Sequence, residues 1–119
     1  MVEVTVENDK LVFDVRGLDR VLAFRGRLEV PLQHVTGVRV DPEAAREWRK
    51  VKVIGTNVPS VVTAGTFWQH HRRVFWDVHD ADDVVVVGLE HESYDELIVE
   101  VADPEATVAR IREALAARA

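Results

Sequence analysis

Apolar and polar residues alternate along the first part of the chain. Valine occupies every second position from Val2 to Val6, and residues 11–16 resume the alternation after Asn8 and Asp9. A period of two is typical of a strand that buries one face, and asparagine followed by aspartate is typical of a turn. Residues 2–16 therefore predict a β-hairpin.

Short apolar runs continue through the rest of the chain, separated by glycine, proline or acidic residues. They predict strands at residues 21–24, 28–32, 34–40, 60–64, 73–79, 84–89 and 97–101. Pro31 must lie at a sheet edge or at the end of its strand, because proline has no N–H group to donate to a ladder. Gly37 predicts a bulge in its strand. Since several of these runs are very short, we expect about seven strands in all.

An aspartate followed by a proline occurs twice, and each pair favours the start of a helix. Aspartate accepts hydrogen bonds from the free N–H groups of a first turn, and proline fits the first helical position. Asp41 and Pro42 predict a short helix over residues 41–48, and Asp103 and Pro104 predict a C-terminal helix. The second helix carries one apolar stripe, formed by Val108, Ile111 and Leu115.

Short, evenly spaced strands of this kind predict an antiparallel barrel or sandwich. The apolar stripe of the C-terminal helix must be buried, and a helix over one open end of a small barrel buries it and protects the sheet edges. A length of 119 residues allows a single domain over residues 1–119. We therefore expect a mainly β fold, a small bent antiparallel barrel of about seven strands capped by a C-terminal α-helix.

Composition and charge exclude several classes of protein. The absence of cysteine excludes disulfide scaffolds, thiolate zinc sites, iron–sulfur clusters and cysteine nucleophiles. The net charge of −6, concentrated in residues 61–119, argues against a nucleic-acid partner. The longest apolar run, the four valines at 84–87, is too short to span a membrane, and the N-terminus lacks the pattern of a signal peptide. We expect a cytoplasmic protein that binds no cofactor.

Two segments resemble the bacterial pleckstrin-homology-like (PH-like) domain family. They are V-P-L-Q-H-V-T-G-V at residues 30–38 and V-E-V-A-D-P-E at residues 99–105, which leads into the C-terminal helix. The resemblance implies a bent antiparallel barrel of seven strands with a helix over one end, acting as a non-enzymatic binding or assembly module. Relatives that bind phosphoinositides use a basic cluster in the first hairpin loop. Residues 7–10 are net acidic here, so we do not expect phosphoinositide binding.

The strands at 73–79 and 84–89 predict a second hairpin, centred on Ala81. In that register one face of the hairpin buries alternate valines and Trp76 inside the barrel. The opposite face is then too apolar for free solvent. Its members are Phe75, Val85, Val87, Leu89 and Ile98. We expect this face to be a subunit interface, and cover by the 41–48 helix or use as a binding groove are the alternatives.

The densest group of candidate binding residues lies between positions 68 and 80. A ligand site at the mouth formed by the loops near 17–20, 55–60 and 66–71 would be lined by Trp68, His70, His71 and Arg72. Adjacent histidines on a strand point to opposite faces, and no spacing matches an HExxH or EF-hand pattern. The sequence therefore predicts no dedicated metal site.

Three functions are consistent with these features. The first is a soluble, non-catalytic PH-like module that acts through self-association or through contacts with another protein. The second is a barrel that binds a small ligand or a lipid headgroup. The third is a metal-assisted enzyme that uses Asp77, His79 and Asp80. We expect the first, and hence no enzymatic activity.

Overall fold

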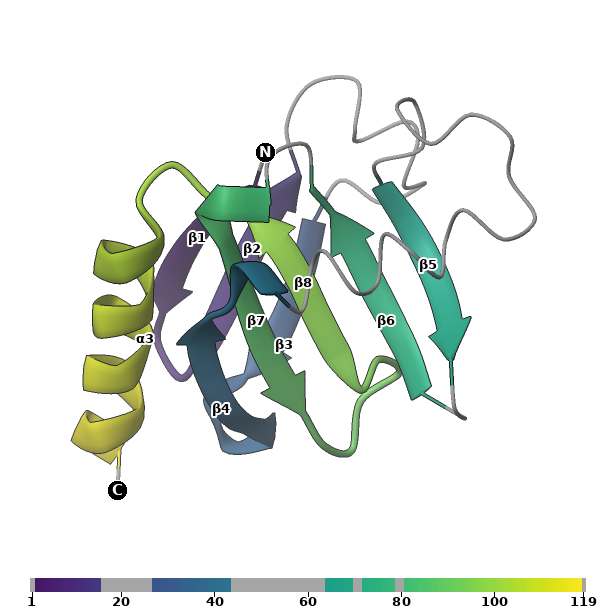
Figure 1. Ribbon diagram of the computed structural model, residues 1–119. Coiled ribbons are helices and arrows are strands. Elements are labelled where there is room, and N and C mark those ends of the chain that lie inside the picture. The colour runs from purple at the N-terminus through teal and green to yellow at the C-terminus, as the bar shows by residue number, and fades with distance from the viewer. Residues whose placement is uncertain (1, 16–26, 44–63, 70–71, 79–80, 119) are drawn as a thin grey trace, which may run out of the picture.

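Strands dominate the part of the chain that the structure describes, and a long C-terminal helix follows them (Figure 1). The computed structural model describes residues 2–15, 27–43, 64–69, 72–78 and 81–118. The strands within these ranges are β1 (Val2–Glu7), β2 (Lys10–Val15), β3 (Arg27–Pro31), β4 (Val35–Val40), β5 (Ala64–Gln69), β6 (Arg72–Asp77), β7 (Val84–Leu89) and β8 (Glu96–Glu100). Two 3₁₀ turns, η1 (Leu32–His34) and η2 (Ala81–Asp83), and the helix α3 (Pro104–Arg118) complete them. The mainly β class with a C-terminal helix is confirmed.

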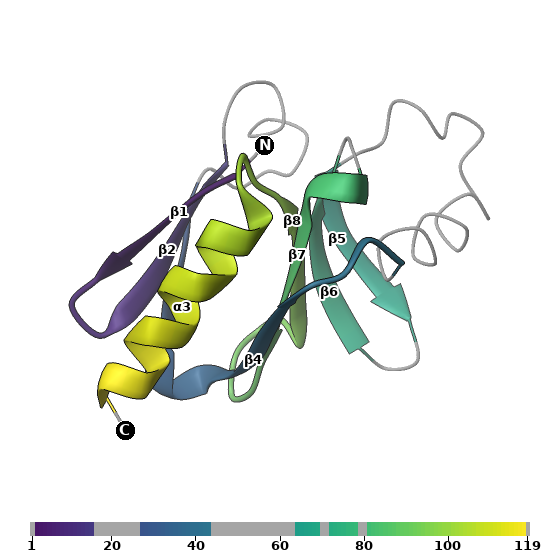
Figure 2. The same ribbon diagram turned by 60° about the vertical axis from the view of Figure 1, so that its left-hand side comes forward.

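The strands form two sheets (Figures 1 and 2). The first has the order β1-β2-β3, and the second has the order β4-β7-β8-β6-β5. The chain passes from the first sheet to the second through η1, between β3 and β4. In the described ranges no ladder closes the two sheets into one barrel, but two sheets with a C-terminal helix fit a PH-like fold.

The first hairpin forms as its alternation predicts. Glu7 pairs with Lys10, and the turn between them places Asn8 in the left-handed region at φ 56°. Asparagine tolerates this conformation better than most residues. The alternate residues Val4 and Phe13 lie opposite each other and are both buried, so one face of this sheet faces the core.

Three of the predicted elements lie wholly or mostly outside the described ranges. Pro42 and Glu43 are helical, at the start of the predicted helix over 41–48, and the rest of that helix lies outside the described residues. The predicted strand at 21–24 also lies outside them, as does most of the predicted strand at 60–64.

The predicted hairpin between residues 73–79 and 84–89 is wrong. β8 lies between β6 and β7, so that Trp76 and Val86 both pair with Ile98 and not with each other. The pairing of β6 with β8 is parallel, in contrast to the antiparallel pairs predicted throughout. The physical reason is burial: all five residues of β8 are buried, and a strand covered on both faces belongs in the middle of a sheet.

The main core lies between the first sheet and one face of the second. Leu11 and Phe13 of β2 belong to the same apolar cluster as Leu97 and Val99 of β8, and Ile111 of α3 completes it. The opposite face of the second sheet carries a separate apolar cluster. Its members are Val74, Trp76, Val78, Val84, Val86 and Ile98. The four consecutive valines at 84–87 are therefore divided between two clusters, one on each face of the sheet.

The apolar face predicted as a subunit interface is buried inside a single chain. Phe75, Val85, Val87 and Leu89 lie in the main core, packed against the first sheet and α3, and Ile98 points to the opposite cluster. Four of these side chains do share one face, as predicted, but the expectation that this face is exposed is wrong, and Ile98 belongs to the other face. In the structure, β1, β2, β3 and α3 cover this apolar face.

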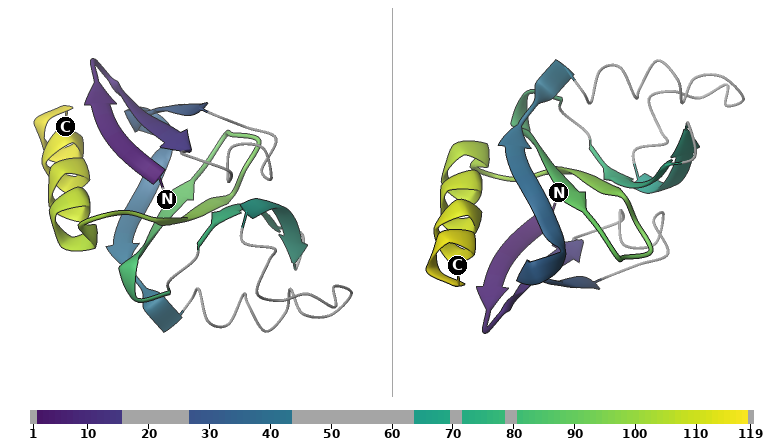
Figure 3. Two further views of the ribbon diagram at one scale, coloured as in Figure 1. Left: turned by 90° about the horizontal axis from the view of Figure 1, so that it is seen from above. Right: turned by 90° about the horizontal axis from the view of Figure 1, so that it is seen from below.

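The C-terminal helix begins where the aspartate–proline pair predicts. The Asp103 Oδ1 atom accepts a hydrogen bond of 3.1 Å from the Ala106 N–H, which is the contact expected of an N-cap. The predicted stripe is confirmed: Val108 and Ile111 are buried, and Leu115 is partly buried against the core. α3 packs against β1, β4, β7 and η1, along the open side between the two sheets (Figures 2 and 3).

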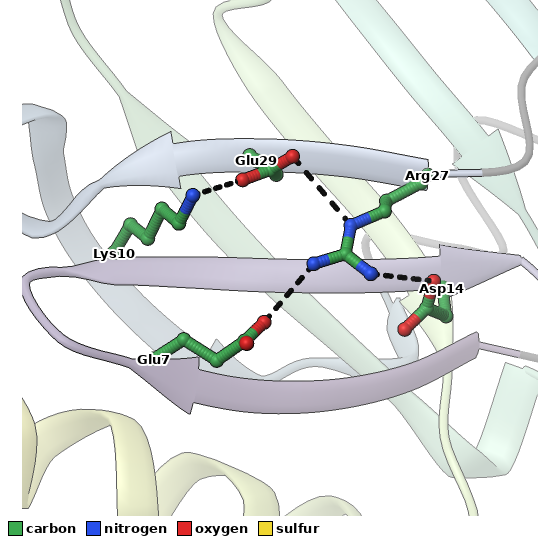
Figure 4. A network of polar contacts seen from close by, with 5 residues as sticks. All are labelled: Glu7, Lys10, Asp14, Arg27 and Glu29. Atoms are coloured by element: carbon green, nitrogen blue, oxygen red, sulfur yellow. Dashed lines mark hydrogen bonds and ion pairs between the residues drawn. The ribbon is translucent and has the colours of Figure 1, made fainter.

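The outer face of the first sheet carries a network of ion pairs (Figure 4). Arg27 contacts three carboxylates, those of Glu7 at 3.1 Å, Glu29 at 3.5 Å and Asp14 at 4.0 Å, and Lys10 pairs with Glu29. These residues come from all three strands, so the network links β1, β2 and β3. Each pair is partly exposed, so solvent screens it and each contributes little to stability.

The position of Val87 in the main core predicts a large loss of stability on truncation. Val87 is 0% exposed, so Val87→Ala should lower the free energy of unfolding by about 2–3 kcal/mol through lost burial and a residual cavity. Val6→Ala is a matched control, because Val6 is 41% exposed and should lose far less. Urea unfolding of both variants measures the difference, and equal losses would contradict the assignment of Val87 to the core.

The ion network predicts a pH-dependent stability. The hydrogen bond and charge of Lys10 hold the pKa of Glu29 below its ordinary value of 4.5, and Arg27 adds to this lowering. A carboxylate with a depressed folded-state pKa stabilises the fold above its unfolded-state pKa, and this contribution is lost as the pH falls through the folded-state pKa. Glu29→Gln should therefore be less stable than wild type at pH 7, and the difference should shrink as the pH falls below about 4.5.

Urea unfolding at a series of pH values measures this difference. Glu113→Gln, on the exposed part of α3, is the control for loss of one negative charge. A difference between Glu29→Gln and wild type that stays constant down to pH 2 would show that the network does not act through the Glu29 carboxylate.

A candidate anion-binding groove

A polar groove crosses one end of the second sheet, and its floor is made by glycines. Gly37 of β4 pairs with Gly88 of β7, and Gly88 pairs in turn with Glu96 of β8. The space above Gly37 is open, since a Cβ atom built there meets no atom within 4 Å, whereas a Cβ atom on Gly88 would lie 2.6 Å from Thr36 Oγ1. The volume of this hollow is about 650 Å³. We call it the arginine groove, after Arg39, Arg72 and Arg112, which line it.

The three arginines come from three separate elements. Arg39 lies in β4, Arg72 begins β6, and Arg112 lies in α3. The Arg112 Nη2 atom donates a hydrogen bond of 3.0 Å to the carbonyl oxygen of Val38, on the edge strand β4. This bond fixes the guanidinium of the helix at the border of the groove.

A buried carboxylate orients the other two guanidiniums. The Oε2 atom of Glu96 lies 2.8 Å from Arg72 Nη2 and 3.9 Å from Arg39 Nη2. The Glu96 side chain is only 10% exposed, whereas Arg72 and Arg39 are about half exposed, at 49% and 50%. The glutamate therefore acts as an anchor below two guanidiniums that remain open to solvent on their outer sides.

The guanidiniums keep donors for a ligand. A guanidinium has five N–H donors, and the close Arg72–Glu96 contact joins one nitrogen to one oxygen. Arg39 donates from Nε to Asp41 Oδ2 at 2.9 Å, a bond that does not use its Nη groups, and its Nη2 atom lies 3.9 Å from Glu96 Oε2. Planar forks of this kind match the oxygens of a carboxylate or a phosphate.

One of the predicted ligand residues lies in this groove. Arg72 lines it, as described above. Trp68 lies in β5 and pairs with Arg73 of β6. His70 and His71 lie outside the described residues, as do the loops near 17–20 and 55–60 that were expected to form the mouth of the site.

Of the three residues of the alternative metal-assisted enzyme, only Asp77 lies within the described residues. Asp77 is fully buried at the end of β6, and His79 and Asp80 lie outside the described ranges. Across the residues that the structure describes, no three histidine, aspartate or glutamate side chains are placed to hold a metal ion. Within the same ranges, no helix has the length and apolar character needed to cross a membrane.

Arg39 and Arg112, the other two members of the groove, were missed by the sequence reasoning. They are 73 positions apart, and only the strand order and the packing of α3 on β4 place them together. A signal was present in Gly37 and Gly88, because a glycine inside a valine-rich strand often marks a bulge or a close approach. The ladder between β4 and β7 does shift register between Val35 and Gly37, which confirms the predicted bulge.

The two floor glycines should respond differently to substitution. Gly37→Ala should raise the free energy of unfolding by about 0.5–1 kcal/mol, because its Cβ enters open space and glycine is costly in a strand. Gly88→Ala should lower it, because that Cβ would lie 2.6 Å from Thr36 Oγ1. Urea unfolding checks both, and Thr36→Ala should rescue Gly88→Ala. Equal effects at the two glycines would contradict the geometry of the floor.

Comparison of the chain with known proteins adds no relative to this picture. Neither the protein-family models, nor the curated proteins, nor the solved structures gave a match. The use of the groove is therefore inferred from the residues that form it.

Proposed function

We propose that this protein is a non-catalytic PH-like module that binds an anionic group, a carboxylate or a phosphate, in the arginine groove. The observation that carries the proposal is the convergence of three guanidiniums, from β4, β6 and α3, on a hollow with a glycine floor. Membership of the bacterial PH-like family is part of the proposal. It is supported by the two sheets, by the C-terminal helix and by the segments at residues 30–38 and 99–105.

Ligand binding is better supported than self-association through the predicted interface. Self-association was expected because Val85 and Val87 were placed on an exposed face, and both are now found in the main core. The arginine groove, in contrast, is open, and two of its guanidiniums are half exposed. The function that the sequence placed second therefore gains the stronger structural argument.

The first hairpin is a poor competitor for the same ligand. Its single basic residue, Lys10, pairs with Glu29, and Glu7 pairs with Arg27 on the same face (Figure 4). These cations already have carboxylate partners, and the turn adds Asp9. The contrast with the groove supports our expectation that the protein does not bind phosphoinositides in the way that uses a basic first loop.

Charge in the groove favours modest, salt-sensitive binding. The lining contains three arginines and the carboxylates of Glu96 and Asp95, and Asp41 pairs with Arg39 beside it. Asp95 is also engaged, since its Oδ2 atom accepts a 2.8 Å hydrogen bond from the Arg73 N–H. The charges are therefore close to balanced, and it is the half-exposed guanidiniums of Arg39 and Arg72 that attract an anion, an attraction that dissolved salt screens.

A titration with inorganic phosphate tests the proposal directly. Amide signals of Gly37 and Gly88 in ¹⁵N NMR spectra should shift and saturate, and added sodium chloride should weaken the response because it screens the guanidiniums. Arg112→Gln and Arg39→Gln should each weaken binding about tenfold, which corresponds to loss of one charge-assisted hydrogen bond. A parallel titration with acetate compares a carboxylate with a phosphate.

Arg118→Gln is the matched control. Arg118 ends α3 and is exposed, so its loss removes the same charge without touching the groove. Gly37→Val keeps all three arginines but fills the space above the floor of the groove. This variant should abolish the shifts that phosphate causes. Shifts that map away from the groove, or an equal effect of Arg118→Gln, would overturn the proposed function.

A further inference from the structure

The balance of charge around the arginine groove determines which anion suits it. Its three guanidiniums share the lining with the carboxylates of Glu96 and Asp95. A third carboxylate, that of Asp41, lies beside the lining and accepts a 2.9 Å hydrogen bond from Arg39 Nε. Within the described ranges, three positive charges therefore face three negative ones. Clefts that concentrate a multiply charged ligand carry an excess of the opposite sign, and this groove does not.

Arg73, the second residue of β6, does not change this balance. Its guanidinium carbon lies 4.7 Å from the centre of the Tyr94 ring, and its Nη1 atom donates a 3.3 Å hydrogen bond to the Ser93 carbonyl oxygen. Successive side chains of a strand point to opposite faces, so Arg73 and Arg72 lie on different faces of the sheet. The Arg73 backbone N–H does bond to Asp95, but a neutral donor does not cancel the charge of that carboxylate.

A balanced set of charges distinguishes anions by their own charge. Removing an anion from water costs free energy that rises steeply with its charge, and a balanced site returns no net Coulomb attraction for the second charge of a dianion. The groove instead offers directional donors, on the half-exposed guanidiniums of Arg39 and Arg72. A guanidinium fork binds the two oxygens of one carboxylate. These properties favour one negative charge shared by two oxygens.

We infer that the arginine groove is selective for a monoanionic carboxylate, and that Glu96 and Asp95 discriminate against dianions such as sulfate and doubly charged phosphate. Charges placed against the wrong ligand are a common source of specificity. The inference rests on the proposed function and narrows it, because it names which of the two anions the groove prefers. Phosphate should still bind, but more weakly than a carboxylate.

The rest of the groove accommodates the molecule that carries the carboxylate. A volume of about 650 Å³ is much larger than a carboxylate group alone. The space above Gly37 is open, and the Thr36 hydroxyl covers Gly88, so an uncharged polar chain can lie along the floor. The carboxylate can belong to a small organic acid or to the C-terminal residue of a polypeptide, since the same donors recognise both.

Titrations with anions of different charge test the selectivity with the full chain. At constant ionic strength, the amide shifts of Gly37 and Gly88 should reach half-saturation with acetate at a concentration about tenfold lower than with sulfate. Methanesulfonate, which has the tetrahedral shape of sulfate and a single charge, should also bind more tightly than sulfate. Sulfate bound as tightly as either monoanion would overturn the inference and leave the proposed function standing, whereas a groove that responds to no anion would overturn both.

Glu96→Gln removes one negative charge and keeps the size of the side chain. Its amide oxygen can still accept the hydrogen bond from Arg72, so the variant should tighten sulfate binding about tenfold and acetate binding less. Asp95→Asn should act in the same direction, since its amide oxygen can accept the Arg73 N–H, and it replaces Glu96→Gln should that variant fail to fold.

Asp9→Asn is the matched control for these two variants. Asp9 is exposed in the turn of the first hairpin, and its substitution removes the same charge away from the groove. It should leave the affinities for acetate and sulfate unchanged. A preference for acetate over sulfate that stays at its wild-type value in the variants of Glu96 and Asp95 would contradict the inference.

Two further ligands identify the source of the carboxylate. Acetyl-triglycine carries a free C-terminal carboxylate on an uncharged chain, and it should bind more tightly than acetate because the space above Gly37 receives the chain. Equal binding of acetyl-triglycine and acetate would assign the groove to small acids, in agreement with the inference. The C-terminal amide of acetyl-triglycine lacks the charge and should cause no saturable shift, and an amide that binds as well as the free acid would overturn the inference.

Discussion

Burial of β8 on both faces is the constraint on which the rest of the structure depends. Leu97 and Val99 point into the main core, and Ile98 points into the opposite cluster. A strand with both faces covered is typical of the middle of a sheet, and β8 has β7 on one side and β6 on the other. The four valines of β7 are divided between the same two clusters for the same reason.

The position of β8 also creates the arginine groove. Glu96 begins the strand, on the face of Ile98, where a buried carboxylate requires cationic partners. On one side of β8, the neighbouring strand β6 supplies Arg72. On the other side, β4 lies beyond β7 and supplies Arg39, next to the glycine pair that joins β4 and β7. An arrangement with β6 and β7 paired directly would separate these groups. The central strand that organises the core therefore also organises the charges at its end.

Local patterns predicted the local structure well and the long-range pairing poorly. The alternation at residues 2–6 gave the first hairpin, and the pair Asp103-Pro104 gave the start of α3, because both depend on neighbours in sequence. The pairing of β6 was mistaken, because the acidic residues at 80–83 indicate a reversal of the chain without indicating which strand lies alongside. Val85 and Val87 do share a face with Phe75, but local patterns did not reveal that the first sheet and α3 cover this face. The arginine groove was foreseen only at Arg72, since its other members meet through tertiary packing alone.

Nuclear Overhauser contacts between backbone protons test the central position of β8 most directly. A central β8 predicts contacts of the parallel type between Trp76 and Ile98, and contacts of the antiparallel type between Ile98 and Val86. Direct cross-strand contacts between Trp76 and Val86 would instead show that β6 and β7 form a hairpin, and they would contradict both the division of the core and the assembly of the arginine groove.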